Sequence, residues 1–175
     1  MHIKNTLTEY GLISKFFHWL SAALIFVQIP LGFYLVDLDF DPKRITIESI
    51  HIFIGLSIFY LVIFRLLNNI FNPVPKLNPA LFKGQKIIAK LNHIFFYITI
   101  LSITVSGILK KLFNGENLTI FFQEIKINDN YILADQFYNI HILSNYLLII
   151  LISLHILAVI IHRIFFNENL LKKIL

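Results

Sequence analysis

The chain has 175 residues, of which 57% are hydrophobic and only 14% are charged, and its mean hydropathy is +0.75. Soluble domains carry about a quarter charged residues, so this composition excludes a soluble domain and predicts an integral membrane protein. The formal net charge is +5 and there is no cysteine. Without cysteine, disulfides, iron–sulfur clusters and thioether-linked haem are excluded, and any metal must be held by other ligands.

Four apolar runs are long enough to cross a bilayer, which takes about 20 residues of helix. The sequence therefore predicts an all-α fold, an integral membrane four-helix bundle that runs up-down-up-down and forms a single domain over residues 1–175. The expected helices are 16–36, 50–71, 87–109 and 138–166. No small-residue cleavage site follows the first run, so we expect a retained helix and not a removable signal.

Basic residues are distributed unevenly between the two ends of the expected helices. Ten of the fifteen lysines and arginines lie in or near the N-terminus, the second connection and the C-terminus, while the first and third connections hold most of the acidic residues. By the positive-inside rule, both termini are expected in the cytoplasm. The net positive charge is thus interpreted as a topology signal and not as a nucleic-acid-binding patch.

The segments outside the four runs also carry predictions. Residues 72–85 contain three prolines and are expected to form a cytoplasmic loop. The longest connection, 112–137, is an outer loop of a length that often covers a site, and its FFQEI stretch is expected to form a short interfacial helix. The basic tail NENLLKKIL is expected to lie on the inner leaflet.

Histidines inside the apolar runs are the candidate site residues, because an ionisable side chain is costly in hydrocarbon and marks a functional position. His141 and His155 are separated by 14 positions, which returns to nearly the same helix face after about 21 Å. The alternative is that each is an isolated histidine hydrogen-bonded to a neighbouring helix. Two imidazoles on one face, with further histidines in the other runs, favour a functional site.

Alternating helix directions place these histidines at two depths. His51 and His141 share the outer level, and His18 and His155 share the cytoplasmic level. Two facing imidazoles suit one flat iron porphyrin ligated on both faces, whereas a structural zinc site needs four ligands around one point. The sequence therefore favours two porphyrins.

Two further histidines, His93 and His162, compete for the cytoplasmic level by depth alone. Both have aromatic residues one turn away, which leave little room for a porphyrin edge. The four favoured histidines instead have small residues at that distance, namely Ala22, Gly55, Ser144 and Ala158. Arg65, which follows His51 by 14 positions, is either an arginine that extends to the lipid headgroups or a partner for a buried anion such as a haem propionate.

Taken together, these residues resemble the bacterial cytochrome b561 family, within the wider group that includes the cytochrome b subunits of nickel–iron hydrogenases and some formate dehydrogenases. The resemblance covers nearly the whole chain. Its marks are the HW pair at His18, I-H-x-x-x-G at His51, N-H-x-x-x-Y at His93 and the two histidines of the fourth run. The tail departs from the family's usual ending, so nothing is carried over to it.

The resemblance implies two haems b with bis-histidine ligation, one held by His18 and His155 and the other by His51 and His141. It also implies that Arg65 and two more histidines, His93 and His162, lie near haem propionates or a quinone site.

By the same resemblance, the expected function is a multi-pass electron-transfer protein of the bacterial inner membrane that exchanges electrons with ubiquinone. Its one-electron donor would be superoxide or a periplasmic redox protein, which would make it an oxidoreductase.

Two alternative functions remain. One is a haem-bearing membrane anchor subunit of a hydrogenase or dehydrogenase, although the short connections offer little docking surface. The other is a small transporter or proton channel that uses intramembrane histidines. A relay across the midplane fits less well, because the histidines near the boundaries lie about one turn inside the membrane.

Overall fold

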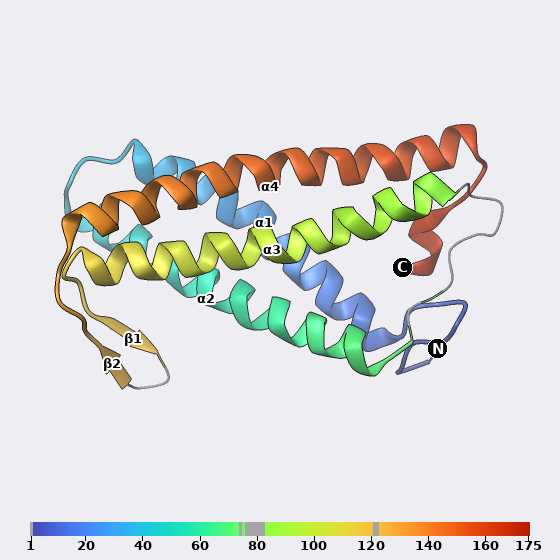
Figure 1. Cartoon of the computed structure of the whole chain (residues 1–175), viewed down its shortest axis with the longest axis horizontal. Coiled ribbons are helices and arrows are strands. Elements are labelled where there is room, and N and C mark those ends of the chain that lie inside the picture. The colour runs from blue at the N-terminus through green and yellow to red at the C-terminus, as the bar shows by residue number, and fades with distance from the viewer. Residues whose placement is uncertain (1, 74, 76–82, 121–122) are drawn as a thin grey trace. The chain divides into compact units, whose positions relative to one another are not determined.

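The computed structural model describes the whole chain except residues 1, 74, 76–82 and 121–122 (Figure 1). The elements, in chain order, are α1 (Leu12–Val36), α2 (Pro42–Phe71), α3 (Lys83–Phe113), β1 (Leu118–Ile120), β2 (Gln123–Ile125), α4 (Tyr131–Phe165) and the 3₁₀ turn η1 (Leu170–Lys173). Two compact units are distinguished: unit 1 is Met1–Asn92 with Leu154–Leu175, and unit 2 is His93–Ser153. The prediction of a single transmembrane domain stays a prediction.

Four of the described helices are long and apolar enough to cross a membrane, with mean hydropathies of 1.8, 2.2, 1.6 and 2.5 in chain order. Between 11% and 17% of each apolar window is buried inside the protein, so most of its side chains face outward. In water such a surface would be strongly unfavourable, whereas lipid accepts it. The predicted class, an all-α integral membrane protein with four spanning helices, is confirmed.

Each helix is longer than its apolar run predicts. At α2 and α4, capping side chains and not the hydrophobic boundary mark where the helix begins. α2 begins at Pro42 and not at residue 50, since the Asp41 carboxylate accepts a hydrogen bond of 2.8 Å from the Arg44 backbone N–H. α4 begins at Tyr131 and not at residue 138. There the Asn130 side chain accepts from the Leu133 N–H at 3.1 Å.

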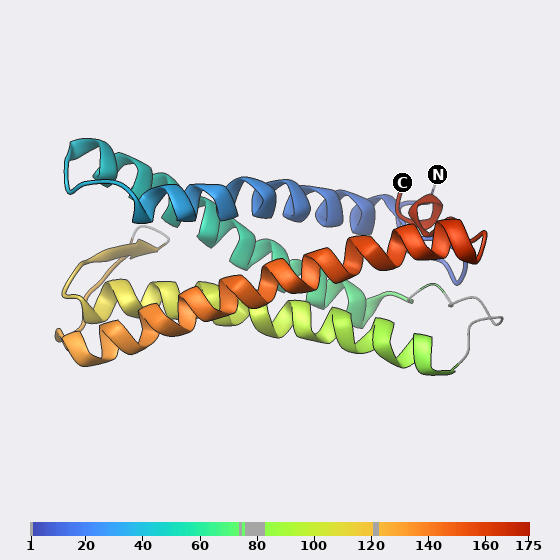
Figure 2. The ribbon, with the colours of Figure 1, turned by 90° about the horizontal axis from the view of Figure 1, so that it is seen from above.

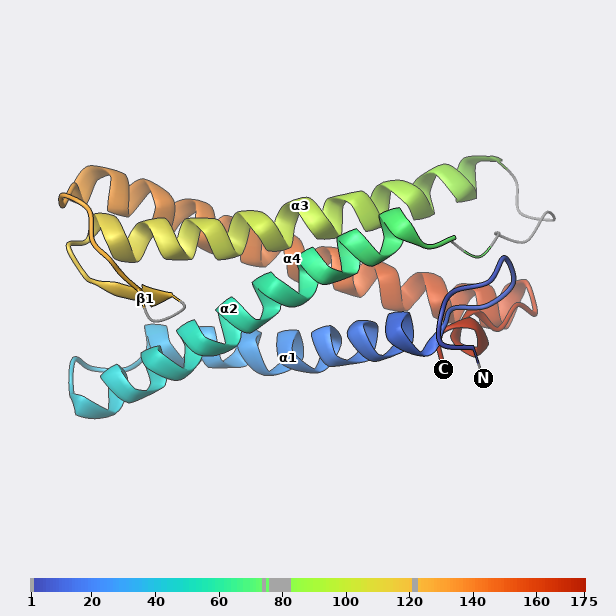
Figure 3. The ribbon, with the colours of Figure 1, turned by 90° about the horizontal axis from the view of Figure 1, so that it is seen from below.

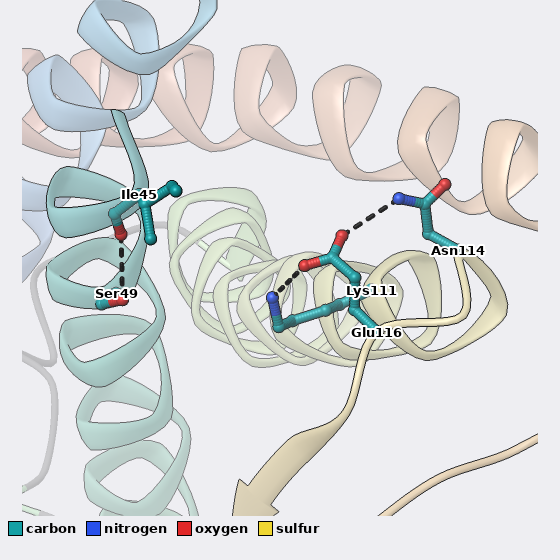
Figure 4. Close-up of polar contacts among 5 residues, drawn as sticks. All are labelled: Ile45, Ser49, Lys111, Asn114 and Glu116. Carbon is teal, nitrogen blue, oxygen red and sulfur yellow. Dashed lines mark hydrogen bonds and ion pairs between the residues drawn. The ribbon is translucent and has the colours of Figure 1, made fainter. Parts of the chain in front are cut away.

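The end of α3 is also determined by local chemistry, at the turn that follows Phe113. Gly115 has φ of +81°, a backbone conformation that glycine adopts without strain, and its N–H bonds the carbonyl of Leu112 at 3.1 Å. This is a common way to end a helix. In Figure 4, Glu116 beyond this turn accepts hydrogen bonds from Lys111 and Asn114.

The predicted interfacial helix in the outer connection is wrong. β1 and β2 form an antiparallel hairpin in which Thr119 pairs with Glu124, and the Asn117 side chain bonds the Glu124 carboxylate. β-branched residues such as Thr119 and Ile120 favour a strand over a helix turn. Residues 121–122, which belong to the predicted helix, lie outside the described residues, as does most of the loop predicted over 72–85.

In unit 1, α1 and α2 form a helical hairpin whose facing sides make a small core (Figure 3). Ser21 is fully buried and Val62 is 1% exposed, and the Ser21 hydroxyl is satisfied by the Phe17 carbonyl at 2.6 Å. At the turn between the helices, the Arg44 guanidinium donates to the carbonyls of Leu35 and Leu38. These contacts hold α1 and α2 in a defined register.

The first and last described segments of the chain lie together in unit 1 (Figure 2). Lys15 Nζ and Trp19 Nε1 donate to the carbonyls of Leu175 and Ile174, at 2.9 and 3.0 Å. Both segments are therefore at the same end of α1, as an even number of crossings requires. The cytoplasmic assignment of that end, and the placement of the tail on the inner leaflet, remain predictions from charge.

Candidate functional site

His18 of α1 lies against Arg65 of α2, within unit 1. The imidazole is half-buried, and its Nδ1 lies 3.3 Å from Arg65 Nη2. A guanidinium only donates hydrogen bonds, so in this arrangement Nδ1 accepts and the neutral ring carries its proton on Nε2.

His155 of α4 also belongs to unit 1, where its Nδ1 lies 3.5 Å from the side-chain nitrogen of Asn92 on α3. The positive charge of Arg65 acts on this imidazole as well. Unit 1 therefore contains both histidines predicted for the cytoplasmic level, and Arg65 interacts with each. Asn92 belongs to the N-H-x-x-x-Y motif, but its contact with His155 was not predicted from the sequence.

His51 of α2 packs against α1 in unit 1. A Cβ added at Gly32 would lie 3.3 Å from the His51 ring carbon Cε1, so the imidazole edge lies over a bare stretch of α1 backbone. One turn earlier, the Gln28 amide donates to the His51 backbone carbonyl at 2.9 Å. Gly55, expected to leave room for a porphyrin, instead faces Gln28, whose nitrogen would lie 3.3 Å from a Cβ there.

His141 of α4 packs against α3 in unit 2. Its Nδ1 lies 2.8 Å from the carbonyl oxygen of Ile103. A carbonyl only accepts, so Nδ1 carries the proton and Nε2 is the ring nitrogen with the lone pair. A histidine that ligates a metal normally has this arrangement. Ser144, one turn along α4, has its hydroxyl 3.1 Å from that of Ser102, so it joins the helices through a polar contact.

The remaining candidates, His162 and His93, have different surroundings. His162 lies 3.3 Å from the Glu168 carboxylate, which also pairs with Lys173 at 3.5 Å, and its ring centroid is 5.2 Å from that of Phe166. His93 is exposed. The predicted location of both near propionates or a quinone site stays a prediction.

The chemistry of this donor set fits a b-type haem best at His141. Within the described residues, no three His, Cys, Asp or Glu side chains gather in a group that would hold a metal ion, but haem iron needs only two axial imidazoles. His141 is in the required tautomer. His18 fits only if Nδ1 gains a proton and Arg65 donates elsewhere. His51 and His141 belong to different units, so their pairing stays a prediction.

Four spanning helices that carry imidazoles within apolar sequence define a multi-pass membrane protein suited to hold haem. A family model described as prokaryotic cytochrome b561 matches residues 9–175, and the chain belongs to that family, as its sequence motifs predict. The family is one of haem b membrane electron-transfer proteins of bacteria.

Among curated relatives, the chain is similar to cytochrome b561 homolog 2 of Escherichia coli (strain K12), with 29% identity over 122 residues. This match covers 69% of the present chain and 65% of the relative. The chain thus matches slightly less than two thirds of that protein's length. The activity and partners of the present chain are therefore treated as proposals.

Two residues that shape the site were missed from the sequence, namely Gly32, which faces His51, and Gly107, which faces His141. Asn92 belongs to the N-H-x-x-x-Y motif, but no role was predicted for it. A glycine inside a helix costs about 1 kcal/mol relative to alanine, so each glycine within an apolar run was a signal. The sequence does not say which partner approaches that glycine, because the partner lies on another helix.

Proposed function

We propose that the chain is a two-haem electron-transfer protein of the bacterial inner membrane that exchanges single electrons with the quinone pool. One haem b is held by His18 and His155, and the other by His51 and His141. The observation that carries this proposal is the His141 imidazole, whose Nδ1–H bonds a backbone carbonyl while Nε2 keeps its lone pair. Family membership supports the choice of haem over another metal group.

At the cytoplasmic level, the support comes from Arg65, which interacts with both His18 and His155. Guanidinium groups form their strongest hydrogen bonds with carboxylates, so Arg65 is the proposed partner of a haem propionate. Donation to a propionate would release His18 Nδ1, and the ring would then adopt the tautomer that ligation needs.

When bound, haem b supplies one-electron redox chemistry, and the protein sets its potential through ligands, burial and nearby charge. The imidazoles orient the ligating nitrogens, and the apolar helices exclude water. Arg65 contributes a positive charge at one level, which favours the reduced state there. At the other level, Lys110 acts electrostatically on His141.

For the one-electron donor, we propose superoxide or a periplasmic redox protein at the outer end, with ubiquinone as the acceptor. Lys110 and Lys111 lie at the end of α3 that is assigned to the outer side by charge. Lys111 is ion-paired with Glu116 (Figure 4), which reduces its attraction for an anion. Lys110 is therefore the residue that we assign to electrostatic attraction of superoxide.

The test of this proposal is the absorption spectrum of the purified protein with and without dithionite, with haem quantified per chain. Two low-spin haems b are expected. His18→Ala and His155→Ala, as separate variants, should each lose the same haem, and His51→Ala and His141→Ala should each lose the other. The matched control is His162→Ala, which should keep both, because this imidazole contacts Glu168.

Substrates are tested by stopped-flow mixing. The oxidised protein should be reduced by superoxide in a reaction that superoxide dismutase abolishes, and the reduced protein should be reoxidised by a short-chain ubiquinone. An intact, membrane-extracted preparation without a Soret band would contradict the two-haem proposal. Haem that exchanges no electrons with ubiquinone would contradict the quinone assignment alone.

A further inference from the structure

We infer that Ile103, Ser106 and Gly107 of α3 form a slot that orients the His141 imidazole and tunes its strength as a ligand. The inference rests on the proposed function in one respect, namely that His141 ligates haem iron. Within this slot, Ile103 supplies a backbone acceptor, Gly107 leaves it accessible, and Ser106 competes for it. All three are positioning residues, since they act through the imidazole.

The acceptor is the Ile103 carbonyl, which lies 2.8 Å from His141 Nδ1. Inside an α-helix this carbonyl also accepts the backbone N–H four residues later, which is that of Gly107. A carbonyl oxygen has two lone pairs. The imidazole therefore binds at the lone pair that the helix does not use, which requires that the side of α3 be open.

Gly107 leaves the side of α3 open next to the Ile103 carbonyl. In an α-helix each Cα–Cβ bond tilts toward the N-terminus, so a side chain covers the preceding turn of its own helix. A Cβ at position 107 would lie 3.1 Å from both Cε1 and Nδ1 of His141. That separation is tighter than an ordinary van der Waals contact, so with alanine at this position the ring would have to shift by a few tenths of an ångström, which would disturb its hydrogen bond to the Ile103 carbonyl.

Ser106 adds a competing donor. Its hydroxyl lies 3.0 Å from the same Ile103 oxygen, and the residue is only 3% exposed. When several donors share one acceptor, each hydrogen bond is weaker than it would be alone. Ser106 therefore limits how strongly the carbonyl polarises the imidazole.

This hydrogen bond affects redox chemistry because a carbonyl that accepts from Nδ1–H makes Nε2 a more basic ligand. A more basic axial ligand stabilises ferric iron and lowers the midpoint potential. The two neighbours of the carbonyl should thus act in opposite directions. A side chain at position 107 should weaken the hydrogen bond from His141 Nδ1 to the Ile103 carbonyl. Loss of the Ser106 hydroxyl should strengthen the same bond.

The primary variant is Gly107→Ala, compared with Val105→Ala, whose parent side chain is on α3 but 43% exposed. Gly107→Ala should retain two haems and raise one midpoint potential. Loss of a typical hydrogen bond changes that haem's oxidised-to-reduced ratio by roughly threefold to tenfold. The electron paramagnetic resonance signal of the same haem should change, since it depends on the orientation of the axial imidazoles. Val105→Ala should leave both quantities unchanged.

The second variant, Ser106→Ala, adds no atom and so cannot displace the ring. It should lower the same midpoint that Gly107→Ala raises, and it decides the question if Gly107→Ala does not fold. The inference is overturned if Ser106→Ala leaves that midpoint unchanged or raises it, or if folded Gly107→Ala behaves like Val105→Ala. The variant His141→Ala distinguishes failure of the slot inference from failure of the proposed ligation. If it retains both haems, the proposed ligation is wrong, whereas if it loses one, only the slot is in question.

Discussion

The Arg65 guanidinium of α2 lies 3.3 Å from Nδ1 of His18 on α1, between two apolar helices. A positive charge in this position has a large effect, because the surrounding hydrocarbon screens it poorly. Arg65 also acts on His155, so one cation influences both imidazoles assigned to the cytoplasmic level.

Replacing Arg65 should therefore change one haem selectively. In Arg65→Gln, we expect the midpoint potential of the haem lost in His18→Ala to fall. Loss of the nearby positive charge should change the oxidised-to-reduced ratio by about tenfold, since ion–haem interactions of this kind amount to about 1–2 kcal/mol. Potentiometric titration measures this shift in midpoint potential. Arg163→Gln, which changes an exposed arginine of α4, is the control, and equal shifts in both variants would refute a specific role.

The second charge prediction concerns Lys110, which acts on His141 in unit 2. Lys110→Gln should lower the midpoint of the haem lost in His141→Ala and leave the other unchanged. It should also slow reduction by superoxide, with a smaller difference at high salt. Redox titration and stopped-flow mixing measure the two effects. Lys126→Gln, which alters an exposed lysine after β2, should do neither.

The pH dependence of the outer turn follows from Glu116. Burial alone raises its pKa, but hydrogen bonds from Lys111 and Asn114 and the charges of Lys111 and Lys110 lower it by more, so the net pKa lies below 4.5. A lowered pKa means that the charged form stabilises the folded state above the unfolded pKa, and that this contribution is lost as the pH falls through the folded pKa.

We therefore expect the thermal midpoint to fall between pH 6 and pH 3 by more in the parent chain than in Glu116→Gln. The difference should be small, because the Glu116 side chain is 39% exposed and solvent screens its ion pair. Differential scanning fluorimetry in detergent measures it. Glu9→Gln, at an exposed carboxylate of the N-terminal segment, should keep the parental pH dependence; the same loss in both variants would exclude a role for the Lys111 pair.

The tail is expected to detach when its contacts with α1 are removed. In Trp19→Phe, the hydrogen bond to the Ile174 carbonyl is lost while the aromatic ring remains. One hydrogen bond is worth about 1 kcal/mol, so the open population should rise about fivefold. Cleavage after Lys172 by trypsin, followed by mass spectrometry, measures that population. Phe26→Leu, at an exposed residue further along α1, should leave the cleavage rate unchanged.

Hydrophobic length and motif order were sufficient to predict the class and the family, because a bilayer imposes a minimum apolar run and the histidines fall at fixed positions within those runs. Helix ends were predicted less well. Asp41 and Asn130 begin their helices through capping bonds outside the apolar runs, and hydropathy does not register such bonds. The short outer helix was wrong, because β-branched residues such as Thr119 and Ile120 favour the strand pairing that the structure shows.

The sequence by itself determined which side chains are costly in lipid, and thereby which histidines are candidates. Only the tertiary structure decided what each imidazole contacts. Gly107 and His141 are distant in sequence and belong to different helices, so their approach depends on how α3 and α4 pack. A tautomer follows from that contact, since a carbonyl at Nδ1 places the proton there, and a guanidinium at Nδ1 places it on the other nitrogen.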